Sequence, residues 1–192
     1  MWFGSFAALC TLTFVVATWV GVELWIGWRS RGARLTSTSL AAEALISAST
    51  VVAVTVSIVS ATSVPDSQIG PPGAAFVLGV VLMLAGIGIR GLAAATLGSY
   101  YTRTVGVQTG QSICMRGPYR HVRHPGYLGT FAALLGFGLA LGNWGSVLSI
   151  LIVVPALALR IAAEERLLLS VFPNDYGIYC RQTRWRLVPG LL

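Results

Sequence analysis

Five apolar runs, separated by polar connections that hold almost all of the charge, limit most strongly how this chain can fold. They occupy approximately residues 3–25, 40–60, 74–97, 125–141 and 146–159. The first three are long enough to cross a bilayer as helices, which takes about 20 apolar residues. With 55% hydrophobic and 10% charged residues, the 192-residue chain is too apolar for a soluble domain and too short for a large transporter. We therefore expect an all-α polytopic membrane protein with five membrane-inserted helices in a single domain, 1–192.

The last two runs are shorter, and only the residues Gly142, Asn143, Trp144 and Gly145 join them. A connection of this kind predicts an antiparallel helical hairpin. Each arm of about 15 to 18 residues would be only about 22 to 27 Å long, slightly short for the hydrocarbon core. The hairpin would then thin the membrane or lie unevenly in it. Residues 1–97 would hold three membrane helices, and residues 98–192 a polar connection, the hairpin and a C-terminal helical region.

All thirteen basic residues are arginine, and alternating spans place twelve of them on one side of the membrane. Three follow the first run, four lie within 98–123 and five lie from Arg160 onward, whereas the N-terminus, 61–73 and 142–145 have none. By the positive-inside rule the polar connection and the C-terminus are cytoplasmic, and the N-terminus is outside. The net charge of +7 then reflects orientation rather than nucleic-acid binding. Arginine without lysine, together with abundant Ala and Val, indicates a GC-rich bacterium and hence its inner membrane.

Residues 116–129 hold three arginines, both histidines and two tyrosines in an otherwise apolar chain. The two prolines disfavour helix before them, and Gly117 and Gly126 allow close backbone approach, so we predict a shaped loop that enters a helix near Tyr127. His121 and His124 have no adjacent carboxylate or cysteine, so we expect no metal site. His124 either bonds the backbone or contacts a ligand.

Other arginines and tyrosines around this loop have a plain interpretation as anchors at the membrane interface. We expect it for Tyr100, Tyr101 and Arg103, and for at least two of Arg116, Arg120 and Arg123.

Arg160 and Glu164 are four residues apart and share one face of a helix. An intrahelical ion pair is the simpler explanation, but the basic-first order is the less favourable one. Arg160 also lies where an apolar run ends, and charges at membrane depth are functional candidates, so we expect a site role. Arg90, inside the third run, is expected to pair structurally with Glu23 or Glu43.

The ordered motifs resemble one known family. G-P-Y-x-x-V-R-H-P-x-Y-x-G begins at Gly117 and R-x-x-x-E-E begins at Arg160; V-x-V-Q, L-G-N-W, F-x-x-x-Y-x-x-Y and R-L-V-P-G complete the set. Over roughly 101–192 the chain resembles the isoprenylcysteine carboxyl methyltransferase family, in its short prokaryotic integral-membrane form. The H-P-x-Y element alone is weak, because intramembrane sterol and enone reductases carry a similar one. The ordered set is far more specific.

This resemblance implies S-adenosylmethionine as cofactor, in a pocket roofed by the C-terminal region, and a lipid substrate that enters from the bilayer. The implied cofactor-binding residues are Gln108, Gln111, Ser112, Ile113, Cys114, Tyr119, His124, Pro125, Gly126, Tyr127 and Glu164. Arg160 would be the catalytic and substrate-binding residue, facing the substrate carboxylate. The stretch from Gln111 departs from the usual H-x-L-V pattern, so contacts there would come from the backbone.

The chemistry agrees with these roles. Methyl transfer from a sulfonium is an in-line displacement that needs alignment, and a carboxylate is already ionised at neutral pH, so it needs no base. Arg160 would orient it. An amine or phenol acceptor would need a base, with His124 or Glu165 nearest. We expect methyl transfer to a lipophilic acceptor, such as a prenylcysteine-like, isoprenoid or fatty carboxylate or a lipid amine. The alternatives are an NADPH-dependent membrane reductase and a non-catalytic scaffold.

Overall fold

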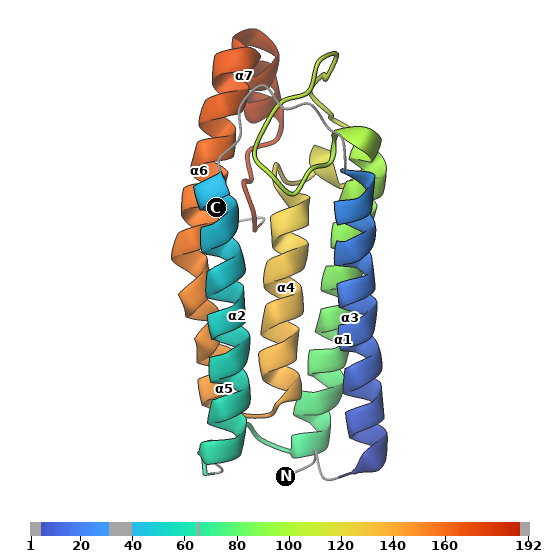
Figure 1. The fold of residues 1–192 in the computed structure, drawn as a ribbon, viewed down its shortest axis with the longest axis vertical. Coiled ribbons are helices and arrows are strands. Elements are labelled where there is room, and N and C mark those ends of the chain that lie inside the picture. Colours follow the sequence, from blue (N-terminus) through green and yellow to red (C-terminus); the bar gives the residue numbers. More distant parts are fainter. Residues whose placement is uncertain (1–4, 31–39, 65, 189–192) are drawn as a thin grey trace.

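The protein is a bundle of long helices capped at one end by a short helix and loops (Figure 1). The computed structural model describes residues 5–30, 40–64 and 66–188, within which helices dominate and an isolated β-bridge joins Gln68 to Asn143. The bundle consists of α1 (Phe6–Arg29), α2 (Leu40–Ser63), α3 (Pro72–Leu97), α4 (Pro125–Ala140), α5 (Trp144–Leu148) and α6 (Val153–Val171). The remaining helices are η2 (Gly98–Tyr100), η3 (Gly117–Arg120), η4 (Ser149–Ile152) and α7 (Pro173–Gln182). The all-α prediction is confirmed for these residues.

Four helical stretches within the described residues are long and apolar enough to cross a membrane: Phe6–Arg29, Ala41–Ser63, Pro72–Tyr100 and Trp144–Val171. The apolar helix α4 is shorter, as predicted for the first hairpin arm. The second arm, 146–159, continues into the C-terminal helical region predicted after it, so that together they form the stretch Trp144–Val171. Hydropathy falls at Arg160, yet the helix goes on because Arg160 and Glu165 are buried and find polar partners.

Helices α3 and α4 pack closely along glycines of both helices. A Cβ atom on Gly86 would lie 2.5 Å from the Gly129 carbonyl oxygen, and one on Gly136 would lie 2.5 Å from the Met83 nitrogen. Such backbone approach stabilises membrane helix pairs through van der Waals contact. Gly88 and Gly91, however, have no such neighbour within 4 Å, so they do not belong to this contact. The seam holds α4, and with it the loop before α4, in the middle of the bundle.

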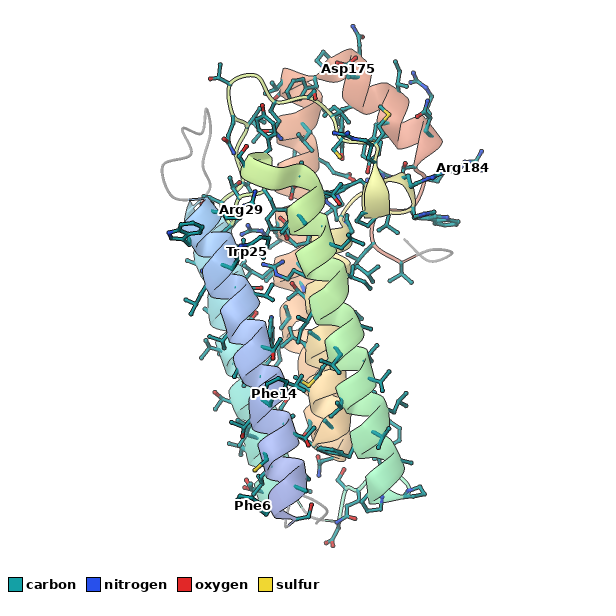
Figure 2. All side chains as sticks on the ribbon, turned by 90° about the vertical axis from the view of Figure 1, so that its right-hand side faces the viewer. Phe6, Phe14, Trp25, Arg29, Asp175 and Arg184 are labelled. Carbon is teal, nitrogen blue, oxygen red and sulfur yellow. The ribbon has the colours of Figure 1, made fainter. Side chains whose placement is uncertain are left out.

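The two turns that lack arginine meet at one end of the bundle. The Ile69 nitrogen donates to the Gly142 carbonyl at 2.9 Å, and the Asn143 side chain donates to the Val64 carbonyl at 2.8 Å. The described parts of the arginine-bearing connections gather toward the opposite end, and Figure 2 shows Phe6 at the first end and Asp175 and Arg184 at the second. Arg31 and Arg34, which contributed to the predicted sidedness, lie outside the described residues.

Candidate active site

A cavity of about 110 Å³ lies at the arginine-rich end, between the polar connection, the start of α4, α6 and α7. Nine of the eleven residues that the sequence suggested for cofactor binding line it: Gln111, Ser112, Ile113, Cys114, Tyr119, His124, Gly126, Tyr127 and Glu164. These come from three separate segments of the chain. Their convergence makes this cavity the candidate active site.

The other two suggested residues shape the wall of the cavity but are not among its lining residues. The Gln108 side chain donates to the Ser99 carbonyl at 2.8 Å, and the Gln108 backbone nitrogen donates to the Gln111 side chain at 3.0 Å, so Gln108 closes the loop on itself. Pro125 is fully buried as the first residue of α4, where a helix has no use for its missing N–H. For both residues a direct cofactor contact stays a prediction.

Several lining residues were missed by the sequence reasoning. Tyr100 and Tyr101 line the cavity, so their interpretation as interfacial anchors was incomplete. Tyr176 and Tyr179 reach it from α7, and their spacing of three places both rings on one helical face. That spacing, within F-x-x-x-Y-x-x-Y, was the signal available in the sequence. The remaining missed residues are Leu97, Thr102, Thr104, Val105, Gly106, Val107, Arg123, Leu167 and Leu168.

Tyr127 joins the two charged residues of α6. Its hydroxyl donates to Glu164 Oε2 at 2.6 Å and accepts from Arg160 Nε at 2.8 Å. Among the described residues Arg160 and Glu164 form no direct ion pair, so the simpler explanation of an intrahelical pair does not hold. The tyrosine instead places a carboxylate at the cavity and a guanidinium beside it.

Arg160 is 5% exposed and is not saturated by its neighbours. Its Nη2 donates to the Arg103 carbonyl, whereas its buried Nη1 has no hydrogen-bond partner within the described ranges. Buried polar groups are nearly always hydrogen-bonded, and a guanidinium can only donate. The Nη1 of Arg160 therefore keeps an unused donor, although Arg160 itself lies behind Tyr127 and is not among the residues that line the cavity.

His124 faces the two adjacent glutamates of α6. Its Nε2 lies 3.2 Å from Glu165 Oε1, its Nδ1 lies 3.9 Å from Glu164 Oε2, and its ring stacks on Tyr127. The side chain thus contacts carboxylates and lines the cavity, and contact with a ligand stays a prediction. Its backbone nitrogen does bond the tail, at the Arg186 carbonyl.

Glu165 fastens the C-terminal tail to the loop before α4. It pairs with Arg123 Nη1 at 2.8 Å and with Arg186 Nε at 3.1 Å, while the Arg123 backbone nitrogen donates to the Trp185 carbonyl. Arg123 is thus an internal partner and not an interfacial anchor; Arg116 and Arg120 remain exposed, as anchors would be. Of the R-L-V-P-G motif, the final Pro189 and Gly190 lie outside the described residues.

Three buried phenols give the cavity neutral walls. Burial raises the pKa of Tyr119, Tyr176 and Tyr179 well above the ordinary value, so all three stay protonated at any physiological pH. The Tyr179 hydroxyl donates to the Tyr119 carbonyl at 2.7 Å. The buried Tyr176 hydroxyl has no partner in the part of the chain that the structure describes, which leaves it available to a ligand.

Comparison with known proteins agrees with the motifs. The model of the isoprenylcysteine carboxyl methyltransferase (ICMT) family matches residues 77–170. A protein-S-isoprenylcysteine O-methyltransferase of Schizosaccharomyces pombe is 35% identical over 98 residues, which cover 43% of this chain and 42% of that protein.

A solved structure of a eukaryotic intramembrane Ras methyltransferase of the same name superposes with a TM-score of 0.59 at 23% identity, over 76% of this chain and 52% of that one. At this identity the likeness concerns the fold. The chain thus spans about half the length of the relatives it matches, or less. The resemblance to the isoprenylcysteine carboxyl methyltransferase family that the sequence motifs predicted is confirmed, with residues 77–170 as the matching segment.

Proposed function

We propose that this protein transfers a methyl group from S-adenosylmethionine to a lipophilic acceptor at a membrane. One observation carries the proposal: at the cavity Tyr127 links Glu164 to a buried Arg160 whose Nη1 lacks a partner among the described residues. This arrangement offers an acceptor for a cationic group and a donor for an anionic one, side by side. In this proposal α1, α2, α3, α4 and the α5–α6 stretch lie in a bacterial inner membrane, with the cavity facing the cytoplasm.

The residues around the cavity fit the cofactor. Glu164 and the Nδ1 of His124 can accept hydrogen bonds from an ammonium group, and the unpartnered Tyr176 hydroxyl can donate or accept. The electron-rich rings of Tyr119 and Tyr101 suit a sulfonium cation. Backbone groups of residues 111–114 can serve an adenosine or amino-acid group. When bound, the cofactor supplies an electrophilic methyl group.

Arg160 would hold the acceptor. Tyr127 and the Arg103 carbonyl fix the guanidinium and leave its Nη1 to orient a carboxylate. Burial excludes water from that carboxylate, which is ionised at neutral pH and needs no base. We propose a prenylcysteine-like or other isoprenoid or fatty carboxylate as the acceptor class, since the Schizosaccharomyces relative is named for isoprenylcysteine.

No observation favours the NADPH-dependent reductase. A dinucleotide phosphate needs free cationic donors, yet Arg123, the one arginine lining the cavity in the described residues, commits Nη1 to Glu165 and Nη2 to the Arg184 carbonyl, which leaves only its buried Nε without a partner.

The first experiment is calorimetric titration of the detergent-purified protein with S-adenosylhomocysteine and, separately, with NADPH. We expect micromolar binding of S-adenosylhomocysteine, weakened at least about tenfold by Glu164→Gln, the loss of a charge-assisted hydrogen bond. Asp66→Asn makes the same change at the opposite end and should leave binding intact. Binding of NADPH alone would replace the proposal with a reductase.

The acceptor is tested with radiolabelled S-adenosylmethionine and three lipophilic probes: an S-farnesylcysteine, a long-chain fatty acid and a long-chain amine. Labelling of a carboxylate that releases methanol on alkaline hydrolysis supports the carboxylate class. Labelling of the amine alone would reject it and would give the proton acceptor's role to His124.

A further inference from the structure

One wall of the cavity, the segment 101–104, is held by charged side chains from outside that segment. Tyr101, Thr102 and Thr104 line the cavity, and the Arg103 carbonyl accepts a hydrogen bond from Arg160. The segment lies in a connection without regular helix. Its local bonds, from the Tyr101 nitrogen to the Gly98 carbonyl and from the Thr102 hydroxyl to the Thr104 carbonyl, do not tie it to the bundle. Side chains of α2, α3 and α6 contact the segment directly, and Glu23 of α1 acts on it through Arg90.

Arg90 of α3 makes the first attachment. Its guanidinium pairs with Glu23 of α1 through two nitrogens, with Nη2 3.0 Å from Glu23 Oε2. Its Nη1 donates to the Tyr101 hydroxyl and to the Gly126 carbonyl, both at 3.2 Å. The planar five-donor fork of arginine can satisfy all three acceptors together, which a lysine ammonium cannot do in the same plane.

The fit at this corner is tight. A Cβ atom on Gly126 would overlap the Tyr101 hydroxyl, so the glycine lets the tyrosine approach the first turn of α4. Both Tyr101 and Gly126 line the cavity. A small displacement of the Arg90 fork would therefore change the cavity itself.

Glu43 of α2 makes the second attachment. The Thr104 hydroxyl donates to Glu43 Oε2 at 3.0 Å, and Arg103 Nε lies 4.0 Å from Glu43 Oε1. Glu23 and Glu43 are the only acidic residues of α1 and α2. The single carboxylate of each helix therefore supports the same cavity wall. Glu23 acts through Arg90, and Glu43 bonds the wall directly.

Charge in a membrane helix is costly, and a helix that served only as an anchor would gain nothing from it. Both helices also precede residue 77, where the family match begins. We propose that Arg90, oriented by Glu23, and Glu43 are positioning residues that hold the wall segment 101–104 in place for binding of the methyl donor. On this proposal, which rests on the proposed function, α1 and α2 complete the cofactor pocket rather than merely anchor the protein.

The test begins with Arg90→Lys, which keeps the charge opposite Glu23 but loses the fork. We expect S-adenosylhomocysteine binding to weaken about tenfold and the KM for the methyl donor to rise by a similar factor, with kcat nearly unchanged. If Arg90 serves only as the counter-charge of Glu23, the Arg90→Lys variant will bind S-adenosylhomocysteine as tightly as the parent protein, and the proposal fails.

Tyr101→Phe removes only the hydroxyl and should fold even if Arg90→Lys does not. It should weaken binding severalfold, and the double variant should be little worse than Arg90→Lys alone, because both changes break one contact. If the fold-change in Kd of the double variant equals the product of the two single fold-changes, the two residues act independently and the proposal is contradicted. Glu43→Gln should also raise the KM for the donor, while Asp66→Asn should not.

Hydrogen exchange supplies a readout that needs no cofactor. In Arg90→Lys, peptides covering 99–107 should exchange about tenfold faster, while peptides covering the turn 66–70 at the opposite end keep their rate. An equal increase in both regions would mean general destabilisation and would overturn the positioning role. If the parent protein does not bind S-adenosylhomocysteine but the selective increase is seen, the proposed function fails and the structural coupling stands.

Discussion

The two ends of the helical bundle differ in how completely their polar side chains are hydrogen-bonded. At the arginine-free end, Asn143 alone donates to the Val64 carbonyl and accepts from the Gly145 and Ser146 nitrogens. At the other end Arg160 Nη1 and the Tyr176 hydroxyl stay buried without partners among the described residues.

This difference separates stability from function. At the first end the buried Asn143 side chain serves the fold, with one donated and two accepted hydrogen bonds. The second end leaves hydrogen-bond donors without partners near the cavity. Unpaired buried donors lower the stability of the empty protein, and they can bind a ligand when one is present. Changes at the two ends should therefore affect different measurements.

The largest effect is expected for Arg160→Lys at the open end. A lysine cannot contact Tyr127, the Arg103 carbonyl and a carboxylate together, so kcat/KM for the acceptor should fall roughly 100-fold. Steady-state kinetics with saturating S-adenosylmethionine measure this. The exposed Arg166→Lys is the matched control and should keep full activity; equal loss in both variants would show that the site has been placed wrongly.

Next in size is Gly86→Ala in the α3–α4 seam, between the two ends. The added methyl group would press on the Gly129 carbonyl, so the free energy of unfolding should fall by roughly 1–3 kcal/mol. Unfolding in a denaturing detergent, followed by circular dichroism, measures it. Gly88→Ala, which meets open space, should be neutral or raise stability by up to about 1 kcal/mol. The seam would be refuted by equal effects of the two substitutions.

Asn143→Ala tests the closed end directly. It removes a helix cap and the bond to Val64, so stability should fall by about 0.5–2 kcal/mol while the Kd for S-adenosylhomocysteine stays the same. The exposed Asn174→Ala should change stability by less than about 0.5 kcal/mol. A weakened Kd in Asn143→Ala would mean that the two ends are coupled after all.

The smallest effect concerns pH. Since burial raises the pKa of Tyr119, Tyr176 and Tyr179, the folded protein keeps protons that the unfolded chain loses above about pH 10. Stability should therefore be independent of these groups below pH 10 and fall as the pH rises beyond it. In a pH titration, phenolate absorbance should appear at a higher pH in the folded protein than in the unfolded protein, and Tyr179→Phe should make this difference in pH smaller. Coincident titration curves would contradict the burial of these rings at the cavity.

Much of this architecture was readable from local pattern. Apolar runs of membrane-spanning length located α1, α2 and α3, and the resemblance carried by the ordered motifs located nine of the residues that line the cavity. The sequence could not show that Arg160 and Glu165 are buried, because their partners come from distant segments. For the same reason Arg123 looked like an anchor.

The sequence by itself determined which segments are helical and apolar, and which residue types gather near Gly117 and Arg160, because backbone bonding and hydropathy depend on neighbours along the chain. Only the tertiary structure decided that Arg90 pairs with Glu23 rather than Glu43, that Tyr127 separates Arg160 from Glu164, and that Tyr101 and Tyr176 line the cavity. Such contacts depend on how side chains from separate helices meet in three dimensions, and no local pattern carries that information.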